Sequence, residues 1–255
     1  MRASLSAFAT TAFALLAACA TSPTGRNQLI LVSKEEVAQM GVASYRDMQS
    51  KVPATRNART SGYVNCVAQR VTAEAGGGSW EVTTFESKDV NAFALPGGKI
   101  GVYTGLLNAA TNQDQLAAVI GHEVSHVLAN HSAARLSNSM AANLGSQVAG
   151  AVTGFDPQLF ALAGNVFFEL PYSRADESEA DILGLELMAR AGFDPRQSIT
   201  LWQNMARQGG DKPSEFLSTH PSDETRIRQL SDRLPVTIPL YEQARAAGKR
   251  PNCSP

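Results

Sequence analysis

Apolar side chains recur at roughly three- to four-residue intervals over most of the chain, which is the period of an amphipathic helix. A capping-box pattern at Ser33 and Glu36 predicts a helix that runs to about Ser50. The same periodicity, ended by glycine or proline, predicts further helices over 58–75, from Thr111 or Asp114 to about Asn130 or beyond, over 174–191, from Asp194–Pro195 to Gly209–Gly210, and from about Pro221. The chain is therefore predicted to be mainly helical.

A strand period is found in only one region, between the second and third predicted helices. Alternating and β-branched residues predict strands over 80–85, 90–95 and 99–103, and Pro96-Gly97-Gly98 forms a turn signal between the last two. We find no internal repeat and no long linker. The pattern therefore predicts a single α+β domain, in which helices surround a small sheet.

The stretch from Met140 to Leu170 is rich in glycine and alanine, with apolar patches, and it allows two interpretations. It forms either a buried hairpin of helices or a mobile cover over a cleft. Repeated glycines and Pro157 interrupt it too often for a membrane span, which needs about 20 consecutive apolar residues.

The N-terminus has the features of a targeting segment. Arg2 precedes a run of apolar and small residues, which ends at Leu16-Ala17-Ala18-Cys19. This ending resembles the bacterial lipobox, which implies a lipoprotein signal peptide over residues 1–18, cleavage before Cys19 and lipidation of its thiol. Residues 19–30 are then a lipid-anchored flexible tether, and Ala20 favours the outer membrane. The alternative is an ordinary signal peptide that is cut nearby.

Charge and cysteine content narrow the classes of partner and the compartment. The formal net charge is −1 and no basic block occurs, so we expect no nucleic-acid partner. If Cys19 carries lipid, Cys66 and Cys253 remain. An exported chain reaches an oxidising compartment, so these two are predicted to form an intramolecular disulfide; the alternative is two free thiols.

His122-Glu123-Val124-Ser125-His126 has the HExxH pattern on a predicted helix. Residues four apart on a helix lie on one face, about 40° apart, so both imidazoles can bind one zinc ion. Glu123 lies beside them, where it can act as general base on a zinc-bound water. The sequence therefore predicts one catalytic Zn²⁺ per chain. The alternative is a helix with two solvated histidines.

His131 is an apparent third ligand, but its spacing argues against that role. It follows His126 by five residues, and Ala129 offers no glycine at which the helix could turn. On a continuing helix His131 lies about 140° around the axis from His126. We therefore predict a histidine on the helix surface, or one that supports a ligand without binding the metal.

The acidic segment from Ser173 to Asp181 supplies the better candidate. Glu177 and Asp181 are four residues apart on a predicted helix and share a face, whereas Glu179 points to the other side. Glu177 is predicted to be the third metal ligand, and Asp181 to accept the free ring N–H of a ligand histidine. The alternative is a solvated acidic face.

HExxH followed by this SRxxExEAD segment resembles the zinc metallopeptidase family of HtpX and the CAAX-prenyl endopeptidases, which are gluzincins. Further matching stretches are Asn91–Gly98, Thr104–Leu107, Ala191–Pro195 and Thr219–Ser222, within about residues 30–233. They most resemble the periplasmic BepA/LoiP/YcaL-like lipoprotein branch. The resemblance implies a zincin-type domain over residues 31–234 and a C-terminal tail over 235–255, without the helical repeats or membrane helices of other members.

The resemblance also implies a periplasmic endopeptidase for unfolded or misassembled envelope proteins, with polypeptide substrates added as a strand along Asn91, Ala92, Phe93 and Ala94. His220 is expected at or near the metal as a movable fourth ligand, and Arg226 is a candidate for oxyanion stabilisation. Two other functions remain open: a binding factor for outer-membrane protein assembly with suppressed proteolysis, and a zinc-stabilised scaffold.

Overall fold

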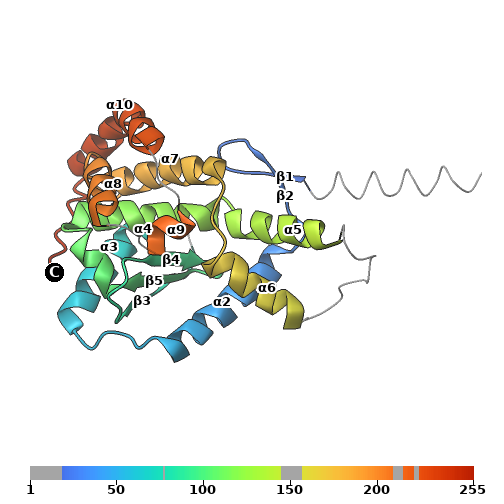
Figure 1. Ribbon diagram of the computed structural model, residues 1–255. Helices are drawn as coiled ribbons and strands as arrows, with labels where there is room; N and C mark the ends of the chain where they lie inside the picture. Colours follow the sequence, from blue (N-terminus) through green and yellow to red (C-terminus); the bar gives the residue numbers. More distant parts are fainter. Residues whose placement is uncertain (1–18, 77, 145–156, 209–214, 221–223) are drawn as a thin grey trace, which may run out of the picture.

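The computed structural model describes residues 19–76, 78–144, 157–208, 215–220 and 224–255 (Figure 1). The predicted signal peptide lies outside these residues. The described helices are α2 (Lys34–Lys51), α3 (Ala58–Ala73), α4 (Gln113–Leu128), α5 (His131–Leu144), α6 (Pro157–Phe168), α7 (Arg174–Arg190), α8 (Gln197–Gln208), α9 (Glu215–Thr219) and α10 (Glu224–Ala246), with a 3-10 turn over Thr104–Asn108. The strands are β1 (Cys19–Thr21), β2 (Asn27–Leu29), β3 (Glu81–Phe85), β4 (Ala92–Leu95) and β5 (Lys99–Tyr103).

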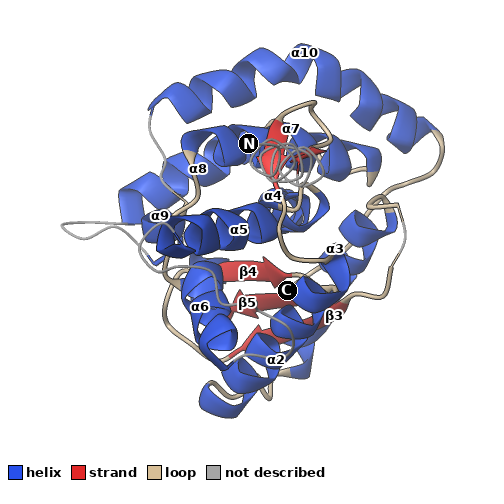
Figure 2. Cartoon of the chain, turned by 90° about the vertical axis from the view of Figure 1, so that its right-hand side faces the viewer, coloured by secondary structure: helices blue, strands red, loops and turns tan. Residues whose placement is uncertain are grey.

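A three-stranded sheet forms the middle layer, with β5 in the centre, β3 parallel to it and β4 antiparallel at one edge. Alternate side chains of the strands enter two different cores. Ala94 and Ile100 pack with α3 and α4, whereas Phe93 and Leu95 pack with α2, α5 and α6. Figure 2 shows the sheet between α4 and α2. This arrangement confirms the predicted α+β class.

Most predicted elements are present, with ends shifted by a few residues. The Ser33–Glu36 capping box is formed at the start of α2. The N-cap of α4 is Asn112, whose side chain accepts from the Gln115 amide at 2.9 Å, so neither Thr111 nor Asp114 has that role.

The glycine-rich stretch contains the end of α5 and the whole of α6, and these two helices pack against each other and against α2. Ala163 and Val166 are fully buried in this packing. The result favours the helical-hairpin interpretation for the described part, while residues 145–156 lie outside it.

Two predicted flanking segments have regular structure that the sequence did not predict. Residues 19–30 do not form a free tether, because β1 and β2 pair as an antiparallel hairpin and Ser22 and Gln28 are buried in it. The boundary at residue 234 falls inside α10, which continues to Ala246, so the predicted tail is largely helix. In the described part of the chain, no helix combines the length and apolar character needed to cross a bilayer.

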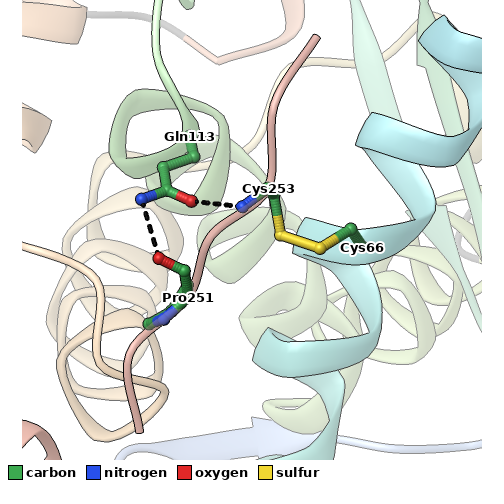
Figure 3. Close-up of a disulfide and its surroundings, with 4 residues drawn as sticks. All are labelled: Cys66, Gln113, Pro251 and Cys253. Carbon is green, nitrogen blue, oxygen red and sulfur yellow. Dashed lines mark hydrogen bonds between the residues drawn. A yellow bond between two sulfur atoms is a disulfide. The ribbon is translucent and has the colours of Figure 1, made fainter.

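Cys66 and Cys253 form the predicted disulfide, with their Cα atoms 5.8 Å apart (Figure 3). Gln113, the first residue of α4, holds the same C-terminal segment. Its side chain donates to the Pro251 carbonyl at 3.1 Å and accepts from the Cys253 amide at 2.8 Å. The end of the chain is therefore fixed against both α3 and the N-terminus of the HExxH helix.

Helices α4 and α7 approach each other closely at a pair of glycines. A Cβ atom added to Gly121 would lie 2.8 Å from the Gly184 carbonyl oxygen, and one added to Gly184 would lie 2.7 Å from the His122 nitrogen. Only glycine allows this backbone approach. The crossing brings the acidic face of α7 against the histidines of α4.

Replacing Gly184 by alanine is therefore expected to destabilise the protein. Backbone atoms that cannot move aside would meet the new methyl group, and such overpacking typically costs about 1–3 kcal/mol, equivalent here to a fall in Tm of roughly 2–12 °C. Gly62→Ala is the matched control, because a Cβ at that helical glycine meets nothing within 4 Å. Thermal unfolding followed by circular dichroism measures both, and an unchanged Tm for Gly184→Ala would contradict the packing argument.

Candidate metal centre

Four buried side chains from three segments converge behind β4. His122 and His126 come from α4, Glu177 from the first turns of α7, and His220 from the residue after α9. Each offers one donor atom, and these atoms all lie within 4.8 Å of one another. The cluster contains the three predicted ligands and the predicted fourth histidine.

The three predicted ligands, His122, His126 and Glu177, lie close to one another. His126 Nε2 lies 3.0 Å from His122 Nε2, and the Glu177 carboxylate oxygens lie 3.4 Å from the first nitrogen and 3.5 Å from the second. Two imidazoles and a carboxylate, buried and at such separations, are the donor set that zinc prefers. The residues present therefore fit the predicted metal.

The charge states of two of these groups suit metal binding. Burial lowers the pKa of His126 well below its usual range, so its ring is neutral and carries a free lone pair. Burial raises the pKa of Glu177, but His220, His122 and a hydrogen bond from His126 outweigh it and hold that pKa well below its usual range. Glu177 is thus ionised.

Glu123 lies next to this cluster and makes few hydrogen bonds. Its Oε2 accepts from the Ala94 amide at 3.3 Å, and its Oε1 lies 3.4 Å from His220 Nε2 but makes no hydrogen bond with a described residue. Burial raises the pKa of the Glu123 carboxyl above its usual range. A buried carboxylate with an unused oxygen and a raised pKa has the properties of a general base.

Asp181 and Arg226 support the cluster from the side of His122. Asp181 Oδ1 accepts from His122 Nδ1 at 3.0 Å, the contact that the sequence predicts. Arg226 donates to both oxygens of Asp181, at 2.7 and 2.8 Å, and to Glu177 Oε2 at 2.7 Å. Its guanidinium also stacks on the Trp202 ring at 3.5 Å. In this state Arg226 clamps two carboxylates, and its role as an oxyanion donor stays a prediction.

His220 lies inside the cluster. Its Nδ1 is 2.9 Å from Glu177 Oε1 and 3.2 Å from His122 Nε2. The ring is buried and stacks on Phe216, and its backbone amide donates to the Phe216 carbonyl at 2.8 Å. The histidine is thus held at the predicted metal position. The helix predicted to start near Pro221 is described from Glu224 onward.

The structure corrects the prediction for His131. Helix α4 ends at Leu128, Asn130 has a φ of 55°, and α5 begins at His131, so the assumed continuous helix is broken. His131 is therefore fully buried and not on the surface. Its Nδ1 lies 2.9 Å from His126 Nδ1, on the side of that ring away from the cluster. Of the two roles predicted for it, the support of a ligand matches this position.

The predicted substrate strand lies beside the cluster. Asn91 precedes β4, and Ala92, Phe93 and Ala94 belong to it. Since β5 pairs with one edge of β4, the Ala94 amide on the other edge is available to Glu123. All of β4 is buried in this state, and the Val90 carbonyl just before it accepts from the Phe216 amide at 3.2 Å.

Sequence reasoning missed two aromatic residues. The Tyr172 ring stacks on His126 with centroids 3.8 Å apart, and Trp202 lies over the Arg226 guanidinium. Tyr172 directly precedes Ser173, the N-cap of α7. Because it directly precedes the N-cap of α7, Tyr172 could have been predicted to lie near the site. The spacing of Trp202 in the sequence gives no such indication.

Comparisons with known proteins agree with this geometry. Residues 55–234 match the family model "Peptidase family M48". The chain is 39% identical over 180 residues, 69% of its length and 53% of the relative's, to the mitochondrial metalloendopeptidase OMA1 of Schizosaccharomyces pombe. It is 38% identical to the Arabidopsis thaliana protein of that name, with 70% of this chain and 37% of the relative covered. The beta-barrel assembly-enhancing protease of Escherichia coli is 27% identical over 220 residues, 81% of this chain and 45% of that one.

These relatives support the predicted family but not the narrower branch. The mitochondrial enzymes are more identical to the chain than the bacterial protease is, so a specific likeness to bacterial lipoproteins is not established. The matched parts amount to about half of each relative's length or less. The family match itself covers more than half of the chain and includes every residue of the metal cluster. The chain therefore belongs to peptidase family M48, and zinc is the cofactor expected at its cluster of three histidines and one glutamate.

Proposed function

We propose that this metallopeptidase is an endopeptidase that cleaves unfolded or misassembled proteins of a bacterial envelope. The observation that carries the proposal is the cluster of His122, His126 and Glu177, with Glu123 between it and the edge of β4 that does not pair with β5. A metal site, a base and a strand edge that meet in one place are the parts needed for hydrolysis of an extended peptide.

His122, His126 and Glu177 would hold the zinc ion, and the other groups have separate roles. An ion held there would supply Lewis-acid chemistry, which lowers the pKa of a water molecule toward ~7 and polarises a carbonyl group. Glu123 would accept a proton from the attacking water and pass it to the leaving nitrogen. Asp181 holds the Nδ1 proton of His122 and so directs Nε2 of that ring toward the ligand position.

The substrate would pair with the outer edge of β4 as an additional strand. The Ala94 amide, which now donates to Glu123, would be one of the backbone groups offered to it. Such pairing relies on main-chain hydrogen bonds and is weakly dependent on sequence. It therefore suits extended segments, which unfolded proteins expose and folded proteins do not.

The envelope location rests on three observations. First, the lipobox-like sequence ends at Cys19. Second, the chain contains a disulfide, which is typical of proteins in oxidising compartments. Third, one relative is named a beta-barrel assembly-enhancing protease. We accordingly propose a periplasmic protein attached by lipid on Cys19 to the outer membrane. Metabolic labelling with a palmitate analogue, with Cys19→Ala as the control, tests the anchor.

The purified protein is expected to cleave an unfolded model protein such as reduced, alkylated casein at internal bonds. A chelator should abolish cleavage, and one equivalent of zinc should restore it, because the activity depends on the metal centre. Mass spectrometry of the products distinguishes internal cuts from stepwise removal of end residues. Products that differ from the substrate only by terminal residues would contradict the endopeptidase assignment.

His220→Ala is expected to keep zinc and to raise cleavage of the same substrate severalfold. In this state His220 occupies the cluster, and a fourth protein ligand closes a site that catalysis needs open. The measurements are zinc content by mass spectrometry and kcat/KM on casein. A fall in kcat/KM with zinc retained would instead make His220 a stabiliser of the transition state.

The presence of His220 in the cluster also favours a second candidate, a binding factor for outer-membrane protein assembly with suppressed proteolysis. The two functions differ in their need for the base. A Glu123→Gln protein should complement a deletion of the gene if binding is sufficient, and should fail to do so if cleavage is required. Envelope proteins that accumulate with this variant would identify the substrates.

A further inference from the structure

The side chain of His126, a proposed metal ligand, contacts His131, and His131 in turn contacts Glu179. The Nε2 of His126 faces the cluster, so its Nδ1 faces away, 2.9 Å from His131 Nδ1. His131 Nε2 lies 3.2 Å from Glu179 Oε2. All three side chains are buried. A continuous line of contacts therefore runs from the metal position to a carboxylate on the far side of α7.

The metal at one end of this line and the Glu179 carboxylate at the other determine which ring nitrogens carry protons. When Nε2 of His126 binds a metal, the ring proton is on Nδ1, and His131 Nδ1 must accept it. The proton of a neutral His131 is then on Nε2, where it points to the Glu179 carboxylate. Each group thus donates to the next, and no buried nitrogen in the line lacks a partner.

Glu179 is held in place by the N-terminal hairpin of β1 and β2. Its Oε1 accepts from the Thr24 amide at 3.0 Å and from the Thr24 hydroxyl at 2.7 Å, while Arg26 forms an ion pair with Oε2 at 3.2 Å. These contacts come from two residues of the hairpin and fix the position of the Glu179 carboxylate beside His131.

The hairpin also contacts the turn between α4 and α5. This turn places His131 beside His126. The Gln28 side chain donates to the Ala129 carbonyl at 2.9 Å, next to Asn130 with its positive φ. Arg26 makes a second ion pair, at 2.7 Å, with Asp176 in the first turn of α7. Residues from the segment expected to be a tether thus contact both helices that carry metal ligands.

We propose that His131 and Glu179 are positioning residues for His126, and that Thr24 and Arg26 of the N-terminal hairpin complete their support. The arrangement parallels the contact between His122 and Asp181, with a histidine inserted between ligand and carboxylate. Such partners fix the orientation of a ligand ring and raise its basicity, and their removal typically weakens metal binding by about 10–100-fold. The inference rests on His126 being a ligand, as proposed above.

The test compares two replacements of His131, one that keeps the contact with His126 and one that keeps the contact with Glu179. The side-chain oxygen of asparagine is near the position of Nδ1 and can accept from His126, whereas the amide of glutamine reaches toward Glu179 and leaves His126 without an acceptor. Zinc dissociation constants are measured on the full-length protein by competition with a chromophoric chelator. His131→Gln should weaken zinc binding by about 10–100-fold, and His131→Asn should recover most of that loss.

Variants of α7 and of the hairpin extend the comparison. Glu179→Gln should weaken zinc binding, and Arg26→Gln should do so to a smaller extent, because Thr24 still holds the carboxylate. Glu186→Gln, seven residues further along α7 and paired with Arg233, is the matched control and should leave the constant unchanged. For each variant, kcat and KM on casein at saturating zinc and the Tm of the metal-free protein are also measured.

These readouts separate positioning from general stability. A purely structural role would lower the Tm of the metal-free protein and leave the zinc constant of the folded protein unchanged, and that result would overturn the proposal. Equal weakening by His131→Asn and His131→Gln would overturn it as well. If His126→Asn binds zinc normally, the ligand set is wrong, and the proposed function fails separately from this inference.

Discussion

Replacing Glu123 by glutamine is expected to lower kcat by roughly 10²–10⁴-fold, the range that a general base contributes. The protein should nevertheless retain one zinc ion, because Glu123 faces the cluster without being one of its donors. Glutamine has the same shape, and its carbonyl oxygen can keep the hydrogen bond from the Ala94 amide. What it lacks is the ability to accept a proton from the attacking water.

Zinc content, thermal stability and hydrolysis of casein are measured on the same preparation of this variant. The expected combination is full zinc, an unchanged fold and almost no turnover. A substantial loss of zinc would show that Glu123 is a ligand, and retained turnover would show that another group is the base. Glu186→Gln serves as a control for carboxylate loss elsewhere on α7, since Glu186 pairs with Arg190 and Arg233 and is not part of the metal cluster.

The part of the site that could be predicted from the sequence depends on spacing within single helices. Residues four apart on one helix share a face whatever the rest of the chain does, so His122 with His126, and Glu177 with Asp181, could be paired in advance. A zinc ion would unite the two pairs, since two imidazoles need a third protein ligand for a catalytic site. The contact of 3.0 Å between His122 and Asp181 is the structural counterpart of that reasoning.

His131 was misjudged because its place depends on one backbone conformation. The prediction assumed that without a glycine the helix would continue past Ala129. The chain turns instead at Asn130, whose φ of 55° lies in the left-handed region that asparagine enters more readily than most residues. An asparagine at position 130 therefore indicated that the helix could end there, although no glycine is present.

The hairpin at residues 19–29 and the clamp by Arg226 could not be found from spacing, because their partners are distant in the sequence. Thr24 bonds to Glu179, 155 residues away, and Arg226 bonds to Glu177, 49 residues away. A short polar segment with proline and glycine is typical of a flexible linker. Partners far away in the sequence, which include the buried carboxylate of Glu179 and the Ala129 carbonyl, make it an ordered part of the domain.

The second large effect is expected at Glu177. Glu177→Ala should lose zinc affinity and hydrolysis together, and the loss of affinity should exceed the roughly 10–100-fold typical of residues that only orient a ligand. Glu177 Oε2 also accepts from Arg226 at 2.7 Å, so alanine leaves part of a buried guanidinium unpaired. Glu177→Gln keeps an acceptor for Arg226 but offers zinc no charge, and it therefore separates loss of the metal from loss of stability.

Both Glu177 variants are compared with His131→Ala by competition with a chromophoric chelator and by casein hydrolysis at saturating zinc. His131→Ala should bind one zinc ion, more weakly than the parent protein, and should recover activity as zinc is added. Glu177→Gln should have the same fold as the parent and still remain inactive at the same zinc concentration, because His122 and His126 alone do not supply the three protein ligands of a catalytic zinc site. The reverse pattern, with His131 essential and Glu177 dispensable, would mean that the histidine after the break in α4 is the third ligand, and the assignment of α7 as the ligand helix would be wrong.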